Sequence, residues 1–149
     1  MNSRTKNITK HLRRLLRKRE DAQIESRQDL PIMYSMVKQL EKTPADVEVK
    51  PDDFISVVYQ GKKYWTVFHC PCGCSEVVSL PMTEPHRPRW SLRVSRDGYP
   101  TLSPSVWRNQ GCMSHFWIRD GKVYWCGNTG TAPWIARPDL YSHPSRKIV

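Results

Sequence analysis

The sequence is poor in aliphatic side chains and has no long apolar segment. No stretch of its 149 residues approaches the roughly 20 consecutive apolar residues of a membrane-spanning helix. The N-terminal segment is charged and lacks the apolar core of a secretory signal. We therefore expect a cytoplasmic protein with no membrane partner. Only 38% of the residues are hydrophobic, but six Trp and six Tyr are present, which favours a small β-rich fold stabilised by a metal.

Acidic residues are missing from the first part of the chain. Residues 1–19 contain eight Lys and Arg and no Asp or Glu, so this segment supplies most of the net charge of +10. An apolar stripe of Ile8, Leu12, Leu15 and Leu16 predicts an amphipathic helix over residues 7–23. This helix either binds nucleic acid or an acidic partner, or is a solvated helix that docks its leucines on the domain.

A second helix is predicted over residues 31–42, before a linker. Pro31 follows Asp29 at a first-turn position, and Ile32, Met33, Met36, Val37 and Leu40 would face inward. Residues 43–53 contain two prolines and several acids, which is typical of a linker. The predicted organisation is a basic helical appendage over residues 1–50 and a zinc-binding β domain with an irregular tail over residues 51–149.

Beyond the linker the sequence predicts antiparallel hairpins. Strands are expected over residues 54–59 and 63–69, joined by a type II′ turn at Gly61-Lys62, and over residues 76–80. Residues 90–95 and 99–105 are expected to form a further hairpin, with Trp90 opposite Ser105. The predicted fold class is mainly β with N-terminal helices, a small zinc-stabilised domain of antiparallel hairpins.

The last hairpin can be predicted residue by residue. Asp120-Gly121 favours a type I′ turn, because Asp and Gly tolerate positive φ. Counting back from this turn places His115 opposite Cys126, within reach of one metal ion. One face of the hairpin then carries the core residues Phe116, Ile118, Val123 and Trp125. The other face places Trp117 and Tyr124 beside the metal.

The cysteines predict a zinc site. All five lie between residues 70 and 126, and an odd number of thiols in a reducing compartment is better explained by a metal than by disulfides. Thiolates and an imidazole suit tetrahedral zinc, whereas the carboxylate cage of calcium or magnesium is missing. The candidate ligands are Cys70, Cys72, Cys74, Cys112, His115 and Cys126. They exceed the four that zinc needs, so the sequence leaves open which of them bind.

Catalytic and substrate-binding candidates lie near these cysteines. Glu76 is placed to act as a base beside a catalytic zinc, or it is a solvent-facing strand residue. Ser103 and Ser105 lack the Gly-x-Ser-x-Gly elbow of serine hydrolases, and either assist proton transfer or occupy a turn or edge. The segment around Arg89 and Trp90 is a carboxylate clamp or a solvated loop.

Three motifs together resemble one bacterial family. They are HCPCGC from His69, RWSL with PTLSPSVW around Ser105, and GCxxHFWIRDGKVxWC up to Cys126. The sequence is similar, over about residues 54–126, to domains of unknown function encoded beside ubiquitin-like modifiers and relatives of ubiquitin-activating and ubiquitin-conjugating enzymes, in operons linked to phage defence. The resemblance implies a partner in ubiquitin-like conjugation.

The resemblance leaves two roles in that pathway. One is a zinc-dependent peptidase, a hydrolase that matures the modifier or removes it from targets, with Trp117 and Tyr124 gripping the modifier tail. The His-x-His and Ser-x7-Asp signatures of JAB-type metalloproteases are missing, so such a peptidase needs another metal geometry. The other role is a non-enzymatic zinc-stabilised adaptor or ligase-like module. A nucleic-acid-binding zinc protein is the third hypothesis. The peptidase is the function that the sequence favours.

Overall fold

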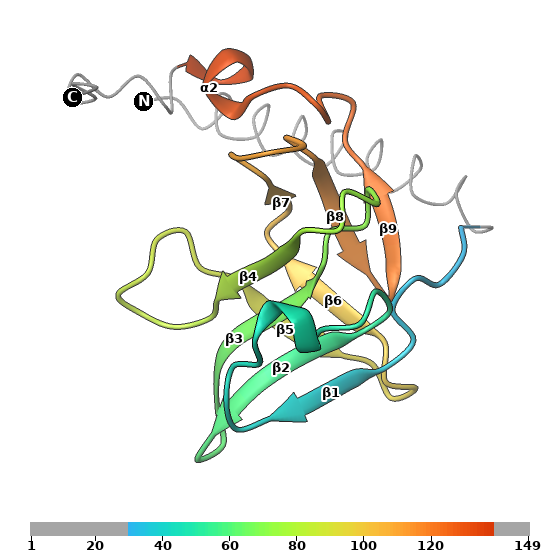
Figure 1. The fold of residues 1–149 in the computed structure, drawn as a ribbon, viewed down its shortest axis with the longest axis vertical. Helices are drawn as coiled ribbons and strands as arrows, with labels where there is room; N and C mark the ends of the chain where they lie inside the picture. The colour runs from blue at the N-terminus through green and yellow to red at the C-terminus, as the bar shows by residue number, and fades with distance from the viewer. Residues whose placement is uncertain (1–29, 139–149) are drawn as a thin grey trace, which may run out of the picture. The chain divides into compact units, whose positions relative to one another are not determined.

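The computed structural model describes residues 30–138, and within this range the chain forms three β-sheets (Figure 1). The first sheet has the order β1-β2-β3-β4, the second is the β5-β6 hairpin, and the third has the order β7-β8-β9. The strands are β1 (Val37–Leu40), β2 (Phe54–Tyr59), β3 (Lys62–His69), β4 (Val77–Pro81), β5 (Ser91–Val94), β6 (Pro100–Ser103), β7 (Val106–Trp107), β8 (His115–Arg119) and β9 (Lys122–Trp125). Single helical turns, η1 (Asp46–Glu48) and α2 (Pro133–Ala136), complete the described elements. The prediction of a mainly β fold is confirmed.

Residues 31–42 do not form the predicted helix and instead contain strand β1. β1 runs parallel to β2, with Val37 opposite Phe54. The Tyr34 ring is fully buried and packs edge-on against Phe54 and Phe68, at centroid distances of 5.2 and 5.7 Å. Backbone pairing with β2 and the burial of Tyr34 therefore override the helical spacing. Four of the five residues that this spacing placed inward are exposed: Ile32, Met33, Met36 and Leu40.

The β2-β3 hairpin has the predicted strands but a different turn. β2 ends at Tyr59 and β3 begins at Lys62, so the turn residues are Gln60 and Gly61. Their φ angles of 50° and 73° are both positive, as in a type I′ turn. The prediction of a type II′ turn at Gly61-Lys62 was wrong because Gln60 adopts the left-handed conformation, which matches the twist of the two strands.

The β5-β6 hairpin is one residue out of its predicted register. Ser91 lies opposite Ser103 and Leu92 opposite Leu102, which makes both leucines face the core. The wider loop that closes the hairpin sets this register, since Ser95 N–H donates to Tyr99 O at 2.9 Å. Burial of both leucines favours the observed pairing, because a slip of one residue would turn one strand's side chains to the other face.

The β8-β9 hairpin has the predicted register and turn. Asp120 and Gly121 have φ angles of 46° and 74°, and the pairs run from Phe116–Trp125 to Arg119–Lys122. Gly121 is required for a second reason, since a Cβ there would lie 2.3 Å from Tyr34 O. Its own carbonyl accepts hydrogen bonds from Met33 N and Tyr34 N at 2.8 and 3.0 Å.

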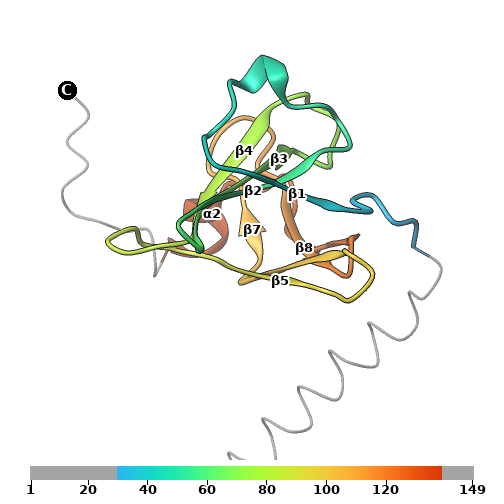
Figure 2. The same ribbon diagram turned by 90° about the horizontal axis from the view of Figure 1, so that it is seen from below.

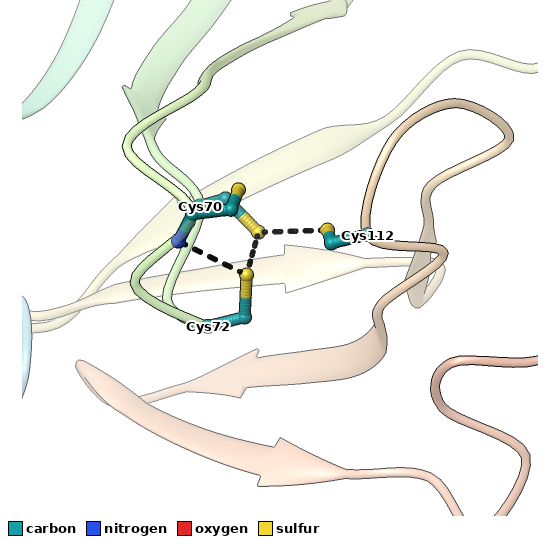
Figure 3. Close-up of side chains that lie close together, drawn as sticks. Cys70, Cys72 and Cys112 are labelled. Atoms are coloured by element: carbon teal, nitrogen blue, oxygen red, sulfur yellow. Dashed lines mark hydrogen bonds between the residues drawn. The ribbon is translucent and has the colours of Figure 1, made fainter.

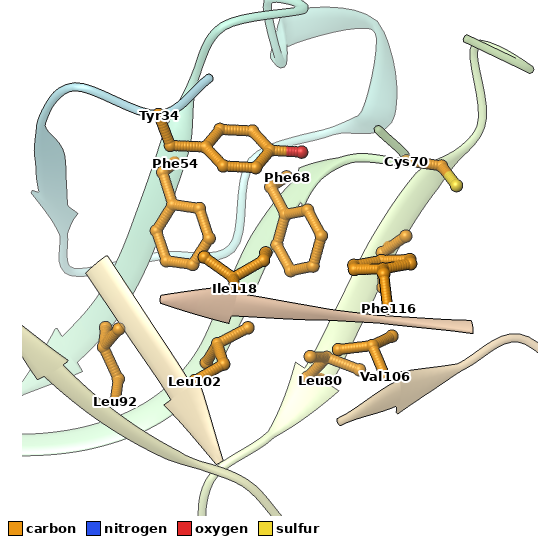
Figure 4. Packing of buried hydrophobic residues seen from close by; sticks show 11 residues of the cluster. Tyr34, Phe54, Phe68, Cys70, Leu80, Leu92, Leu102, Val106, Phe116 and Ile118 are labelled. Carbon is orange, nitrogen blue, oxygen red and sulfur yellow. The ribbon is translucent and has the colours of Figure 1, made fainter. Parts of the chain in front are cut away.

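The core lies between the three sheets. The β5-β6 hairpin crosses the inner face of the first sheet, and β7 and β8 close the remaining side (Figures 2 and 4). The cluster contains Tyr34, Phe54, Phe68, Cys70, Val78, Leu80, Leu92, Leu102, Val106, Phe116 and Ile118. Leu80 of β4 and Val106 of β7 are neighbours in it, so two strands of different sheets approach each other here (Figure 4).

Some predictions concern residues outside the described range. The basic helix over residues 7–23, and with it the nucleic-acid hypothesis, falls on these residues. The predicted boundary at residue 50 follows β1, which is already paired with β2. Within residues 30–138, no helix has the length and hydrophobicity of a membrane span. A cytoplasmic location stays a prediction.

Candidate functional site

Four cysteines form a compact cluster that can hold a metal ion. The Sγ atoms of Cys70, Cys72, Cys74 and Cys112 all lie within 4.8 Å of one another. Cys70 Sγ is 3.4 Å from Cys72 Sγ and 3.7 Å from Cys112 Sγ (Figure 3). A tetrahedral ion with metal–sulfur bonds of about 2.3 Å separates its sulfurs by about 3.8 Å. The cluster therefore has the donor set and the spacing of a four-thiolate metal site.

The thiols of this cluster differ in their acidity. Burial raises the pKa of Cys70 to about 12. Partial burial also acts to raise the pKa of Cys72, but hydrogen bonds from the Ser114 hydroxyl and the Cys74 backbone N–H outweigh it and lower that pKa to about 6. Metals bind thiolates and not thiols, and Cys72 deprotonates more readily than Cys70.

The cluster joins two loops that are far apart in the chain. Cys70, Cys72 and Cys74 belong to the β3-β4 connection, and Cys112 belongs to the β7-β8 connection. Arg108 follows β7 and donates from Nη2 to Glu76 Oε2 at 2.6 Å, which gives the same two connections a second link. Burial opposes the charge of Arg108, but Glu76 and the thiols of Cys70 and Cys112 outweigh it and raise its pKa. Arg108 therefore places a positive charge beside the thiols of Cys70 and Cys112.

A second group of polar side chains forms a hydrogen-bonded series at the start of β7 and β8. Ser105 Oγ lies 3.0 Å from His115 Nε2, and His115 Nδ1 lies 2.6 Å from Asn128 Oδ1. The amide oxygen of Asn128 can only accept, so Nδ1 carries the proton and Nε2 is left as an acceptor. The Ser105 hydroxyl therefore donates to Nε2. This is the protonation state in which a histidine can deprotonate a serine.

The histidine of this series is held from several sides. The Trp107 indole stacks on the His115 ring with 4.2 Å between centroids and 1° between planes. Trp107 is itself fixed by a hydrogen bond from Nε1 to Thr131 O at 3.2 Å. The His115 backbone N–H donates to Thr129 Oγ1, and its carbonyl accepts from Cys126 N, both at 2.9 Å. Ring and backbone are therefore positioned independently of any substrate.

Ser105 and His115 open onto a cleft of about 770 Å³. Strand β4 contributes Val77 and Ser79 to its lining, among others, and β7 contributes Trp107. Trp90 also lines the cleft and donates from Nε1 to Ser105 O at 3.3 Å. The cleft therefore brings a hydroxyl and an imidazole together beside aliphatic, aromatic and polar side chains, a combination that suits a nucleophile and its base.

A family model described as "Bacterial ubiquitination-like system serine protease (BubE)" matches residues 40–126. The chain belongs to this family. No curated protein and no solved structure matches the sequence. Membership confirms the resemblance drawn from the sequence motifs, and it makes the chain a component of a bacterial ubiquitination-like system.

Two of the six predicted metal ligands are not in the cluster of this BubE family member. Within residues 30–138, the group that could hold a metal ion contains four cysteines and neither His115 nor Cys126. The hairpin register behind that prediction is correct, since Cys126 N donates to His115 O. The His115 ring, however, has both nitrogens directed to Ser105 and Asn128. Cross-strand spacing fixed the two backbones but not the direction of the side chains.

The predicted catalytic residues separate in the structure. Ser105 joins His115, whereas Ser103 is exposed and its carbonyl accepts from Ser91 Oγ at 3.4 Å. Glu76 is half exposed and its carboxylate pairs with Arg108, so it is not placed as a proton acceptor for a metal-bound water.

The predicted substrate-binding residues separate as well. Trp90 lines the cleft, whereas Arg89 pairs with Glu84. Trp117 and Tyr124 face each other across β8 and β9 and do not line the cleft. The Arg119 guanidinium lies 4.7 Å from the centre of the Trp117 ring.

Asn128 and Trp107 are the functional residues that sequence reasoning missed. Asn128 lies after β9, in a Gly-Asn-Thr-Gly segment that is typical of a turn. Trp107 lies two residues beyond Ser105, at the end of the PTLSPSVW motif. The β7-β8 register, which places Trp107 opposite His115, is the signal that could have linked these two residues. This register was hard to predict because β7 has only two residues.

Proposed function

We propose that this chain is a serine peptidase that processes or removes the ubiquitin-like modifier of its system. The observation that carries the proposal is the series Ser105 Oγ–His115 Nε2 and His115 Nδ1–Asn128 Oδ1, at 3.0 and 2.6 Å, opening on the cleft. The family description as a serine protease supports the same reaction class.

The series has the parts needed for acyl transfer. Ser105 Oγ attacks the carbonyl carbon of the scissile peptide bond while its proton moves to His115 Nε2. The carbonyl π electrons move to oxygen; when they return, the carbon–nitrogen bond breaks and His115 gives the proton to the leaving amine. Water then attacks the ester on Ser105, passes one proton to His115 Nε2, and releases the carboxylic acid as Ser105 recovers its proton.

Asn128 and Trp107 position the base during these steps. The Asn128 oxygen holds the proton on Nδ1 and so keeps the lone pair of Nε2 directed at Ser105. Asn128 is neutral, so it orients the imidazolium without a full countercharge. The parallel stack of Trp107 restricts rotation of the ring out of this plane. The same order of roles, nucleophile, histidine and asparagine, operates in cysteine proteases of the papain type.

The metal, which we propose to be zinc, has a structural role here. A catalytic zinc keeps an open position for water, whereas four thiols fill the tetrahedral set. The residues that would hold it are Cys70, Cys72, Cys74 and Cys112, and none of them enters the peptidase mechanism. Their function is to hold the β3-β4 connection against the β7-β8 connection. This assignment replaces the metal-activated peptidase that the sequence favoured.

The test compares Ser105→Ala with Ser103→Ala. The substrate is the ubiquitin-like protein of the same system fused through its C-terminus to a fluorescent reporter. Loss of a nucleophile typically costs at least about 10³-fold in rate, so Ser105→Ala should leave no measurable cleavage. Ser103 is an exposed serine two residues away, and Ser103→Ala controls for removing a hydroxyl from this segment. Intact mass after reaction with a fluorophosphonate should show one adduct, located on Ser105.

The outcomes separate the two roles in the pathway. Cleavage by wild-type protein and by Ser103→Ala but not by Ser105→Ala supports the proposal. If a folded, metal-loaded wild-type sample neither cuts the fusion nor reacts with the fluorophosphonate, yet binds the modifier, the peptidase assignment fails and the adaptor takes its place.

A further inference from the structure

Two edge strands face the cleft that contains Ser105 and His115. β4 is the last strand of the first sheet, and β7 is the first strand of the third sheet, so each has one side without a neighbouring strand in its sheet (Figure 1). Both strands line the same cleft. Edge strands expose backbone N–H and C=O groups, which is how a sheet recognises an extended peptide.

The register of β3 and β4 shows which groups are exposed. Cys70 N–H donates to Glu76 O at 2.8 Å before the paired region, and Met82 N–H donates to Tyr64 O at 3.0 Å after it. Hydrogen-bonded pairs alternate in an antiparallel ladder, so between these two points the residues of β4 that bond to β3 are Val78 and Leu80. The backbone groups of Val77 and Ser79 therefore point away from β3.

The exposed backbone groups of Val77 and Ser79 lie on the side of β4 that has no neighbouring strand in its sheet. Within residues 30–138, the N–H and C=O of Val77 and Ser79 make no backbone–backbone hydrogen bond outside the β3-β4 ladder. The next carbonyl in this series, that of Pro81, accepts from Trp90 N at 2.9 Å. At one end of β4, a segment of the chain itself thus bonds to the outer edge, which shows that this edge accepts a neighbouring segment. Beside the cleft the same edge is left open.

Hydrogen-bonded pairs alternate in the same way between β7 and β8. Arg108 N donates to Ser114 O at 2.8 Å, so the Trp107–His115 pair lies at a position of the β7-β8 ladder that makes no bonds between the strands. The N–H and C=O of Trp107 therefore point away from β8, and Trp107 is one of the residues that line the cleft. Backbone groups from both sheets border the space beside Ser105.

We propose that an extended peptide substrate binds in this cleft as an additional strand on β4, hydrogen-bonded to the N–H and C=O of Val77 and Ser79. The inference rests on the proposed peptidase function and names the form of its substrate. It must be a flexible, strand-forming segment with an unblocked backbone, such as the C-terminal tail of a modifier, and not a folded loop. The side chains of the substrate contribute less to recognition than its backbone N–H and C=O groups.

The first test removes one backbone donor from β4. Ser79→Pro deletes the N–H that faces the cleft, and this N–H makes no bond to β3, so the strand tolerates the change as edge strands do. Ser79→Ala is the matched reference, because it removes the same hydroxyl and keeps the N–H. With a fluorogenic peptide of the modifier's C-terminal tail, kcat/KM of Ser79→Pro should fall roughly fivefold to tenfold below that of Ser79→Ala, mainly through KM.

The second test changes the substrate and leaves the protein intact. Variants of the same peptide carry a single N-methyl group on one backbone amide at a time. Strand pairing directs alternate amides toward β4, so we expect kcat/KM to fall at every second position of the segment that lies along β4. N-methylation that lowers the rate equally at all positions, or at none, would overturn the proposal.

A third measurement keeps the two proposals apart. The fluorophosphonate is too small to span the cleft, so its rate of reaction with Ser105 reports the catalytic residues without peptide binding. An unchanged labelling rate with a reduced kcat/KM for Ser79→Pro supports strand pairing. Equal kcat/KM for Ser79→Pro and Ser79→Ala overturns it while the peptidase stands. No labelling of wild-type protein is a failure of the peptidase proposal itself.

Discussion

The role of Asn128 can be tested by removing its amide oxygen. In Asn128→Ala the His115 Nδ1–H loses an acceptor that lies at 2.6 Å, while the stack on Trp107 at 4.2 Å remains. His115 becomes an imidazolium during attack, and a hydrogen bond to a charged group contributes about 1.5–3 kcal/mol. Since about 1.36 kcal/mol of barrier changes a rate tenfold, cleavage should slow by about 10-fold to 150-fold.

The matched variant Asn128→Asp keeps an acceptor oxygen at the same position and should remain within about tenfold of the wild type. Both variants are compared by kcat/KM on the modifier–reporter fusion and by the rate of fluorophosphonate labelling of Ser105. Thermal unfolding controls for a change in the fold. Wild-type rates for Asn128→Ala, or an equal loss for Asn128→Asp, would refute the orienting role of this residue.

Three further predictions concern the metal and the fold. Cys112→Ala should remove bound zinc and lower the melting temperature sharply, because a structural zinc contributes about 10–16 kcal/mol. Cys126→Ala should leave the metal content unchanged. Metal analysis of both purified variants tests this prediction. Gly121→Ala should lower the free energy of unfolding by about 2–5 kcal/mol, since it forces a left-handed conformation and displaces the Tyr34 carbonyl and two hydrogen bonds. Gly61→Ala, with positive φ but open space around it, should cost only about 1–2 kcal/mol in the same urea titration. Burial acts to raise the pKa of Asp53, but hydrogen bonds from Lys38 and Lys50 N lower it overall. Asp53 therefore stabilises the fold fully above its unfolded pKa of about 3.9 and loses this effect as the pH falls through its lower folded value. The stabilities of wild type and Asp53→Asn should differ at pH 7, begin to approach each other at about pH 4 and converge only below the folded pKa.

Local sequence determined the elements whose geometry is set within a few residues. Asp120-Gly121 fixes a type I′ turn by the conformations that the two residues tolerate, and the β8-β9 register follows by counting. The spacing of Cys70, Cys72 and Cys74 likewise places three thiols in one short loop. In these cases the interacting residues are neighbours along the chain, so the distance between them is limited by the backbone itself.

Tertiary structure alone decided the elements that depend on distant partners. β1 is a strand because β2 offers its backbone groups, although the spacing of its apolar residues favoured a helix. His115 matched the spacing of a metal ligand, and only the fold shows that its ring meets Ser105, ten residues away, and Asn128, thirteen residues away. A side chain's direction depends on what packs around it, and those neighbours are brought together only when the sheets assemble. The sequence could therefore identify cysteine, serine and histidine as reactive residues, but it could not divide them into a four-cysteine cluster and a Ser105–His115–Asn128 series.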